Sequence, residues 1–77
     1  MKELLLILAK GLVEDPSAVS VDEDEPDAEG TITLHLHVAP DEMGRVIGKQ
    51  GRIAKAIRTV MRAAAVRQNI RVNVEID

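Results

Sequence analysis

The fold of this chain is decided by the stretch Val46-Ile47-Gly48-Lys49-Gln50-Gly51-Arg52-Ile53. Its two glycines are separated by two residues, and glycine adopts positive φ angles without the steric penalty that a β-carbon imposes. Apolar residues recur at helical spacing on both sides of the pair. The stretch therefore predicts a sharp turn between two helices, where the backbone of another molecule can approach the peptide chain closely.

The two helices predicted around this turn differ in length. The first begins at Pro40-Asp41-Glu42, where proline pre-sets φ and the acids face the positive end of the helix dipole, and it ends at Ile47-Gly48. The second runs from about residue 52 to residue 66. Its expected apolar stripe consists of Ile53, Ile57, Val60 and Ala64, flanked by Ala56 and Met61. We expect this stripe to pack on the core.

Three other segments alternate between apolar and polar residues, as half-buried strands do. The clearest is residues 31–38, whose inward-facing side chains are expected to be Ile32, Leu34, Leu36 and Val38. Residues 70–76 repeat the pattern at the end of the chain. Residues 17–21 form a shorter predicted strand, with Val19 and Val21 on one face.

The N-terminal part supplies one more helix, expected over residues 2–14. It stops at Asp15-Pro16, because the residue before proline is pushed out of the α region. Its apolar run, Leu4–Ala9, is far shorter than the roughly 20 residues that span a bilayer, and it lacks a signal-peptide cleavage site. We therefore expect a buried amphipathic helix and no contact with a membrane.

The predicted elements follow the order α-β-β-α-α-β. The segment Asp22–Gly30, with six acids among nine residues, is expected to be a solvated loop between the first two strands. Two of the strands have one apolar and one polar face, so the helices should cover one side of a three-stranded sheet. The expected class is α+β, with residues 1–77 forming one domain.

Composition narrows the possible functions. The chain has 77 residues and a net charge of −3, with no cysteine and no Phe, Trp or Tyr. No base can therefore stack on an aromatic ring, and a disulfide or a cysteine-based zinc site is excluded. The charge is unevenly distributed, because residues 45–71 hold eight of the ten basic residues and no acid. A local positive potential of this kind favours a polyanionic ligand.

The glycine turn has the chemistry of a nucleic-acid backbone site. The free N–H groups at the start of the following helix face the turn, and basic residues surround it. We expect Val46, Ile47 and Ile53 to give an apolar floor for bases. The full set of candidate RNA-binding residues is Arg45, Val46, Ile47, Gly48, Lys49, Gln50, Gly51, Arg52, Ile53 and Lys55.

These residues resemble the KH domain, whose signature is Ile-Gly-x-x-Gly-x-x-Ile between two helices. Here Ile53 lies one place before the usual trailing aliphatic position, which Ala54 occupies. The element order resembles the type II, prokaryotic arrangement, which implies a mixed three-stranded sheet covered on one face by three helices. The run from Met43 to Arg58 is similar to the KhpA family of small bacterial KH proteins.

The resemblance implies a cytoplasmic, non-catalytic protein that clamps about four nucleotides of single-stranded RNA. Members of the family are described as RNA-binding proteins and RNA chaperones or post-transcriptional regulators. The resemblance also implies a larger KH partner of the KhpB or Jag type, and a link to cell elongation and peptidoglycan control. An alternative is a dimerisation or scaffold module with little RNA affinity of its own, either as a homodimer or with that partner. No cofactor is expected.

Other readings of the same residues are weaker. A nucleotide-binding P-loop does not fit Gly44 to Lys49, because the glycine spacing is too short and Gln50 replaces the required Ser or Thr. His35 and His37 share a strand face, but no acid or cysteine is expected nearby. We therefore expect them to be exposed strand residues and not metal ligands. The basic stripe Lys55-Arg58-Arg62 fits a solvated helix face as well as RNA contact. No pattern typical of an enzyme is visible.

Overall fold

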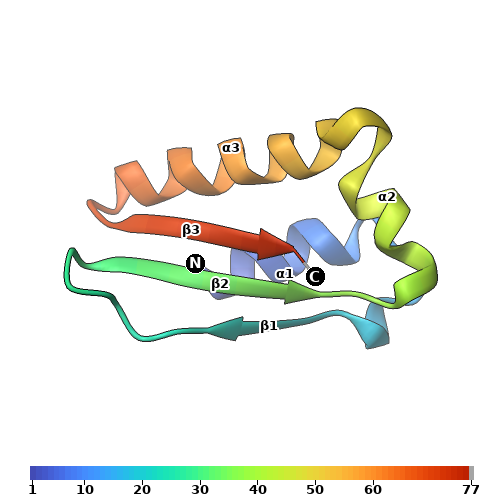
Figure 1. The fold of residues 1–77 in the computed structure, drawn as a ribbon, viewed down its shortest axis with the longest axis horizontal. Helices are drawn as coiled ribbons and strands as arrows, with labels where there is room; N and C mark the ends of the chain where they lie inside the picture. The colour runs from blue at the N-terminus through green and yellow to red at the C-terminus, as the bar shows by residue number, and fades with distance from the viewer. Residues whose placement is uncertain (77) are drawn as a thin grey trace.

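The computed structural model has three strands in one sheet, with helices packed on one of its faces (Figure 1). It describes residues 1–76, apart from the side chain of Lys49. The α-helices are α1 (Lys2–Lys10), α2 (Met43–Ile47) and α3 (Arg52–Arg67). The strands are β1 (Ser20–Glu23), β2 (Thr31–His37) and β3 (Arg71–Ile76). Short 3-10 helices are η1 (Pro16–Ala18), η2 (Pro40–Glu42) and η3 (Lys49–Gly51). This order confirms the predicted α+β class.

The sheet is mixed, as the type II KH resemblance implied. Its strand order is β1-β2-β3; β1 pairs antiparallel with β2, and β3 pairs parallel with β2. Val21 lies opposite Leu36 in the first pair, and Leu34 lies opposite Val74 in the second. A parallel pair needs a crossover connection, and here the segment containing α2 and α3 supplies it. The glycine turn therefore lies inside the crossover.

The core is built without aromatic residues. Its fully buried large side chains come from every layer of the fold. They are Leu5 of α1, Leu34 and Leu36 of β2, Val46 of α2, and Met61 of α3. Because α2 contributes to this cluster, the segment that enters the glycine turn is anchored by apolar burial. No helix in residues 1–76 has the length and apolar character needed to cross a membrane.

The first helix and strand are shifted from their predicted bounds. Helix α1 ends at Lys10 instead of residue 14, and Gly11 follows it as the C-cap. The strand predicted at residues 17–21 begins only at Ser20, because residues 16–18 form the 3-10 helix η1, in which Asp15 accepts the backbone N–H of Ser17. Glycine weakens a helix and aspartate favours local capping, so these residues end regular structure early. Val19 and Val21 are both buried, as predicted.

The core face of helix α3 only partly matches the predicted stripe, because Ile57 is buried and Ile53 half-buried, whereas Val60 is exposed. The buried residues are Ala54, Ile57, Met61 and Ala65. Val60 is 44% exposed, so its assignment to the core face was wrong. The buried face combines two small residues, Ala54 and Ala65, with the larger Ile57 and Met61. Spacing alone does not distinguish these neighbouring faces.

Two acids at the start of the acidic segment contact the two histidines of β2, contrary to expectation. Asp22 lies in β1, and its carboxylate is 3.0 Å from His37 Nε2. Asp24, just after β1, is 2.7 Å from His35 Nε2. These contacts cross the antiparallel pair on the sheet face that the helices leave open. The acids nearest the strand therefore contact its polar face, and the expectation of no nearby acid was wrong.

Candidate nucleic-acid interface

The glycine turn is formed by three residues with positive φ angles, of which Gly51 is in the left-handed helical region. Gly48 has φ 73° and ψ 178°, Gln50 has φ 57° and ψ 27°, and Gly51 has φ 74° and ψ 14°. The N–H of Gly48 donates to the carbonyl of Gly44 at 2.8 Å, and the N–H of Gly51 donates to the carbonyl of Gly48 at 3.2 Å. These bonds close the end of α2 and tighten the turn before α3.

The two glycines are required for different reasons. A β-carbon at Gly48 would lie 2.6 Å from Cγ1 of Ile53, so this position has no room for a side chain. A β-carbon at Gly51 would meet nothing within 4 Å, and only its positive φ favours glycine. Gly51 therefore leaves open space at the start of α3, where a ligand can approach the backbone.

The N-terminus of α3 is not capped by a side chain. Gly51 is the N-cap residue and offers no capping group, while the first helical residue, Arg52, is exposed. The first N–H groups of a helix lack partners within the helix, and the helix dipole makes this end positive. A 16-residue helix that begins at a glycine turn thus presents a site suited to an anion.

The predicted apolar floor is only partly exposed. Ile47 is 39% exposed and Ile53 is half-buried, so both have surface available. Val46 is fully buried in the core. Val46 therefore supports the turn from the interior, and it presents no surface to a ligand in this structure.

The basic residues fall into two groups, those that contact another group of the chain and those that do not. Arg45 pairs with Glu14 at 2.7 Å, and Arg58 Nε donates to the carbonyl of Val74 at 3.2 Å. By contrast, Arg52, Lys55 and Arg62 have no carboxylate within 4 Å in the described part of the chain. The Lys49 side chain lies outside the described residues.

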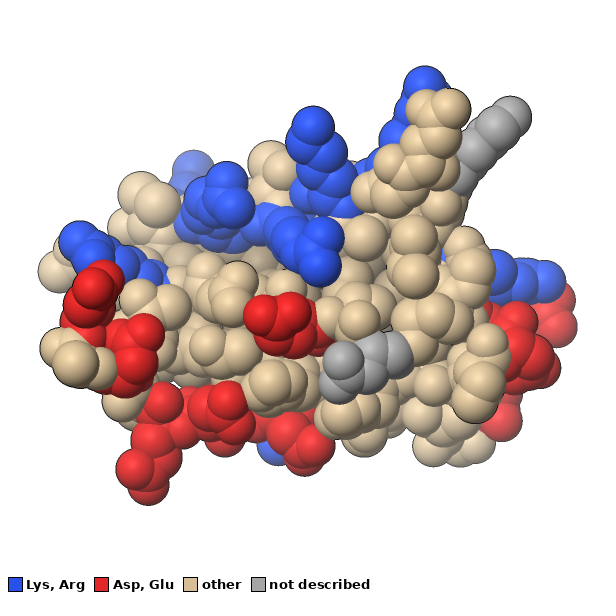
Figure 2. Space-filling view, viewed as in Figure 1, with Lys and Arg blue, Asp and Glu red and all other residues tan. Residues whose placement is uncertain are grey.

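Charge is divided between two edges of the molecule. Figure 2 shows Lys and Arg gathered along the edge formed by α3. Asp and Glu lie mainly below β2 in the region of β1, with further groups in the middle of this face and at the end that carries α2. The basic edge begins at the glycine turn. A net charge of −3 therefore conceals a basic surface around the candidate site.

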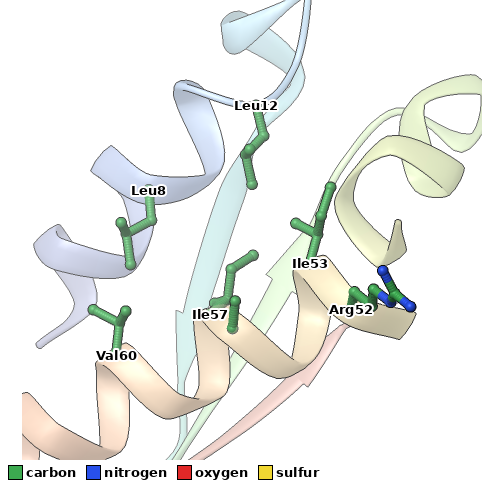
Figure 3. A pocket seen from close by; sticks show the side chains of 7 residues that line it. Leu8, Leu12, Arg52, Ile53, Ile57 and Val60 are labelled. Atoms are coloured by element: carbon green, nitrogen blue, oxygen red, sulfur yellow. The ribbon is translucent and has the colours of Figure 1, made fainter. Parts of the chain in front are cut away.

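An apolar groove that the sequence did not predict lies between α1 and α3 (Figure 3). Its volume is about 350 Å³, and its lining residues are Leu8, Leu12, Arg52, Ile53, Ala56, Ile57 and Val60. Residues 58 and 60 are two positions apart on a helix that turns about 100° per residue, so their side chains point about 160° apart around its axis. Arg58 thus faces β3 while Val60 faces the groove. The spacing of Ile53, Ala56 and Val60 was the available signal in the sequence, but the same spacing also fits the core face of a helix.

The polar face of the sheet is not organised as a metal site. Within residues 1–76, no group of three or more His, Asp or Glu side chains is placed to hold a metal ion. The contacts of His35 and His37 with Asp24 and Asp22 each join one histidine to one aspartate across the strands. Such pairs are usual cross-strand contacts on an exposed sheet face.

Comparison with known proteins extends these observations. A family model described as "KhpA/KhpB, KH domain" matches residues 2–76. The RNA-binding protein KhpA of Clostridium acetobutylicum is 60% identical over 76 residues, which are 99% of each chain. KhpA of Clostridium perfringens is 58% identical with the same coverage. Among solved structures, Era of Aquifex aeolicus bound to GDP and AlF4⁻ matches 97% of this chain and 28% of its own, with a TM-score of 0.65. At 18% identity, the latter likeness concerns the fold alone.

Proposed function

The chain belongs to the KhpA/KhpB family of KH domains, and from this premise we propose that it binds single-stranded RNA at the glycine turn. The curated relatives are named as RNA-binding proteins and not as enzymes, in agreement with the expectation that this chain is not an enzyme. In the proposal, residues 1–77 act as one KH domain.

One observation carries the proposal. The turn has two glycines with positive φ, and it opens onto the uncapped N-terminus of a long helix. An extended phosphate–sugar backbone can then contact peptide N–H groups without meeting side chains at Gly48 or Gly51. Helix-end N–H groups and arginine both favour phosphate over neutral ligands.

The proposed contacts fall into three groups. Arg52 and Lys55 have no carboxylate partner in the described part of the chain and, together with Lys49, bind phosphates. Ile47 and Ile53 offer apolar surface to bases. Gln50 lies between the glycines and provides a hydrogen-bonding side chain. With three or four phosphates neutralised, the log–log salt slope of binding should be about −2 to −3.

The test is fluorescence anisotropy with a labelled pool of single-stranded RNA. Wild type is compared with the double variant Lys49→Asp/Gln50→Asp, which keeps both glycines and places two negative charges in the turn. Aspartate tolerates the left-handed conformation of residue 50, where φ is 57°. A variant that is folded by circular dichroism and has lost most of its affinity would support the turn as the site. Equal binding by both proteins would assign RNA to another surface.

A second candidate function is dimerisation, and the apolar groove between α1 and α3 favours it. Val60 is 44% exposed, beside half-buried Leu8 and Leu12. A second copy offers a surface of the same apolar character, and a two-fold dimer would bury both grooves together. Arg52 and Ile53 line this groove and are also proposed RNA contacts, so dimerisation and RNA binding would share the first turn of α3. Light scattering after size-exclusion chromatography measures the oligomeric state, and anisotropy measures RNA binding by the isolated chain. A tight dimer with no RNA affinity would favour the scaffold alternative.

The family assignment supports a more specific cellular proposal. The protein would act in the cytoplasm as an RNA chaperone or post-transcriptional regulator, paired with a KH protein of the KhpB or Jag type, and would influence cell elongation and peptidoglycan synthesis. Co-purification of the two proteins from cells, with and without ribonuclease, tests the partnership. Cell length after deletion of the gene tests the physiological part, and unchanged length would contradict it.

A further inference from the structure

Glu14 forms an ion pair with Arg45 on α2, the helix that leads into the glycine turn. The distance between Glu14 Oε1 and Arg45 Nη2 is 2.7 Å, and the two side chains are 74% and 56% exposed. Glu14 follows α1, whereas Arg45 lies on α2, immediately before the segment that enters the turn. A basic residue that the sequence assigned to RNA is therefore engaged by a carboxylate of the same chain.

Glu14 is held in place by a second carboxylate. Glu42 is 7% exposed, and its Oε1 accepts the backbone N–H of Glu14, while its Oε2 accepts the backbone N–H of Asp15 at 3.2 Å. Glu42 is the residue before α2 begins, so it ties the backbone of Glu14 to the helix that carries Arg45. The backbone of Glu14 is thereby anchored next to α2, while the two paired side chains stay largely exposed.

We propose that Glu14 determines the affinity of the RNA site. Its carboxylate pairs with the Arg45 guanidinium at the place where RNA would put a phosphate. The inference rests on the proposed RNA-binding function. Carboxylate and phosphate present similar oxygen pairs to a guanidinium, so they compete for the same donors. Exposed ion pairs are weak, and RNA can therefore displace Glu14, but the displacement lowers the affinity.

A polar hollow next to the pair provides a matched control. Its volume is about 200 Å³, and its lining residues are Glu14, Asp15, Ala39, Asp41, Glu42 and Arg45. Asp41 is exposed and, within residues 1–76, makes no ion pair with Arg45. Asp41→Asn thus removes one negative charge from the same hollow without releasing the guanidinium.

The experiment measures RNA affinity for wild type, Glu14→Gln and Asp41→Asn by anisotropy with the labelled single-stranded RNA pool. An exposed ion pair of ordinary strength predicts that Glu14→Gln binds about two- to fivefold more tightly than wild type. Asp41→Asn should give a clearly smaller gain. The salt slope of Glu14→Gln should steepen by up to about 0.7, the value for one more neutralised phosphate on a single strand.

Arg45→Ala completes a double-mutant cycle. If Glu14 acts through Arg45, Glu14→Gln should improve binding in the wild-type background and have little effect in the Arg45→Ala background. Equal gains from Glu14→Gln and Asp41→Asn, or the same gain with and without Arg45, would overturn the inference. Those results would leave RNA binding at the turn intact. Failure of wild type to bind RNA would instead overturn the proposed function.

Discussion

Gly48 and Ile53 are packed so closely across the turn that a β-carbon on the glycine would lie 2.6 Å from Ile53 Cγ1, 2.8 Å from Cβ and 2.9 Å from Cδ1. Three atoms of one side chain therefore occupy the space that any other residue at position 48 would need. The contact joins the end of α2 to the first turn of α3. It fixes the direction in which α3 leaves the glycine turn.

Gly48→Ala should destabilise the protein by about 3 kcal/mol, because the backbone lies in a region almost restricted to glycine and the new methyl group meets Ile53. The matched control is Gly44→Ala in α2, where a β-carbon meets nothing within 4 Å. The control should stabilise the helix by about 0.5–1 kcal/mol. Urea denaturation followed by circular dichroism measures both changes, and equal stabilities would contradict the packing argument.

Gly51→Ala should cost about 1–2 kcal/mol, because its φ is positive but its surroundings are open. Gly51→Asn should cost less, since asparagine adopts this conformation more readily. Denaturation midpoints of the two variants provide the measurement. A loss for Gly51→Ala as large as that for Gly48→Ala would show that steric exclusion at Gly48 is unimportant.

Glu42→Gln should lower the free energy of unfolding by about 1–3 kcal/mol, because the amide has one acceptor oxygen for two backbone N–H donors. The other carboxylate oxygen is replaced by an NH₂ group that faces a backbone N–H. Asp41→Asn, at the exposed neighbouring position, is the control and should change stability by no more than about 0.5 kcal/mol. If chemical denaturation finds the two variants equally stable, the claim that Glu42 stabilises the fold through these hydrogen bonds is contradicted.

Arg58→Ala should reduce stability by about 1 kcal/mol, because Arg58 donates to the carbonyl of Val74 and links α3 to β3. Arg62→Ala removes the same charge from a side chain without such a bond and should be nearly neutral for stability. In RNA titrations both variants should lower affinity if the basic stripe contributes to binding. Equal denaturation midpoints would argue that the Arg58 contact is not structural.

Val60→Asp should convert a dimer to a monomer, since it buries a charge in the proposed apolar interface. Val66→Asp makes the same change on the same helix, at a residue that is 71% exposed and does not line the groove. Light scattering on both variants gives the test, with RNA binding measured in parallel. A dimer lost equally in both variants would place the interface elsewhere on α3, and a monomeric wild type would exclude the dimer proposal.

Much of the fold could be read from the chain because its signals are local. The alternation in residues 31–37 and 71–76 reflects the two-residue repeat of a strand, and the glycine pair interrupts helical spacing where α2 ends and α3 begins. The path of the chain after α1 was less accessible. It depends on Glu42, 28 residues beyond Glu14, whose carboxylate accepts the backbone N–H groups of Glu14 and Asp15.

Some features of the candidate site likewise follow from local sequence, and others depend on residues distant in the chain. Its glycines and its positive region follow from residue type, since glycine adopts positive φ angles without strain and no acid lies between Arg45 and Arg71. The roles of individual side chains do not follow, because they depend on neighbours distant in sequence. Val46 is buried, Arg45 meets Glu14, and Arg58 meets Val74.

The sequence by itself thus determined the element order, the KH-like turn and the basic character of its surroundings, because backbone conformation and local charge are properties of adjacent residues. Only the tertiary structure decided which face of α3 enters the core, which cations are paired and where an apolar groove lies open. These outcomes depend on how helices and strands far apart in the chain pack together. The same helical spacing is compatible with several such packings, and the energy of burial selects one of them.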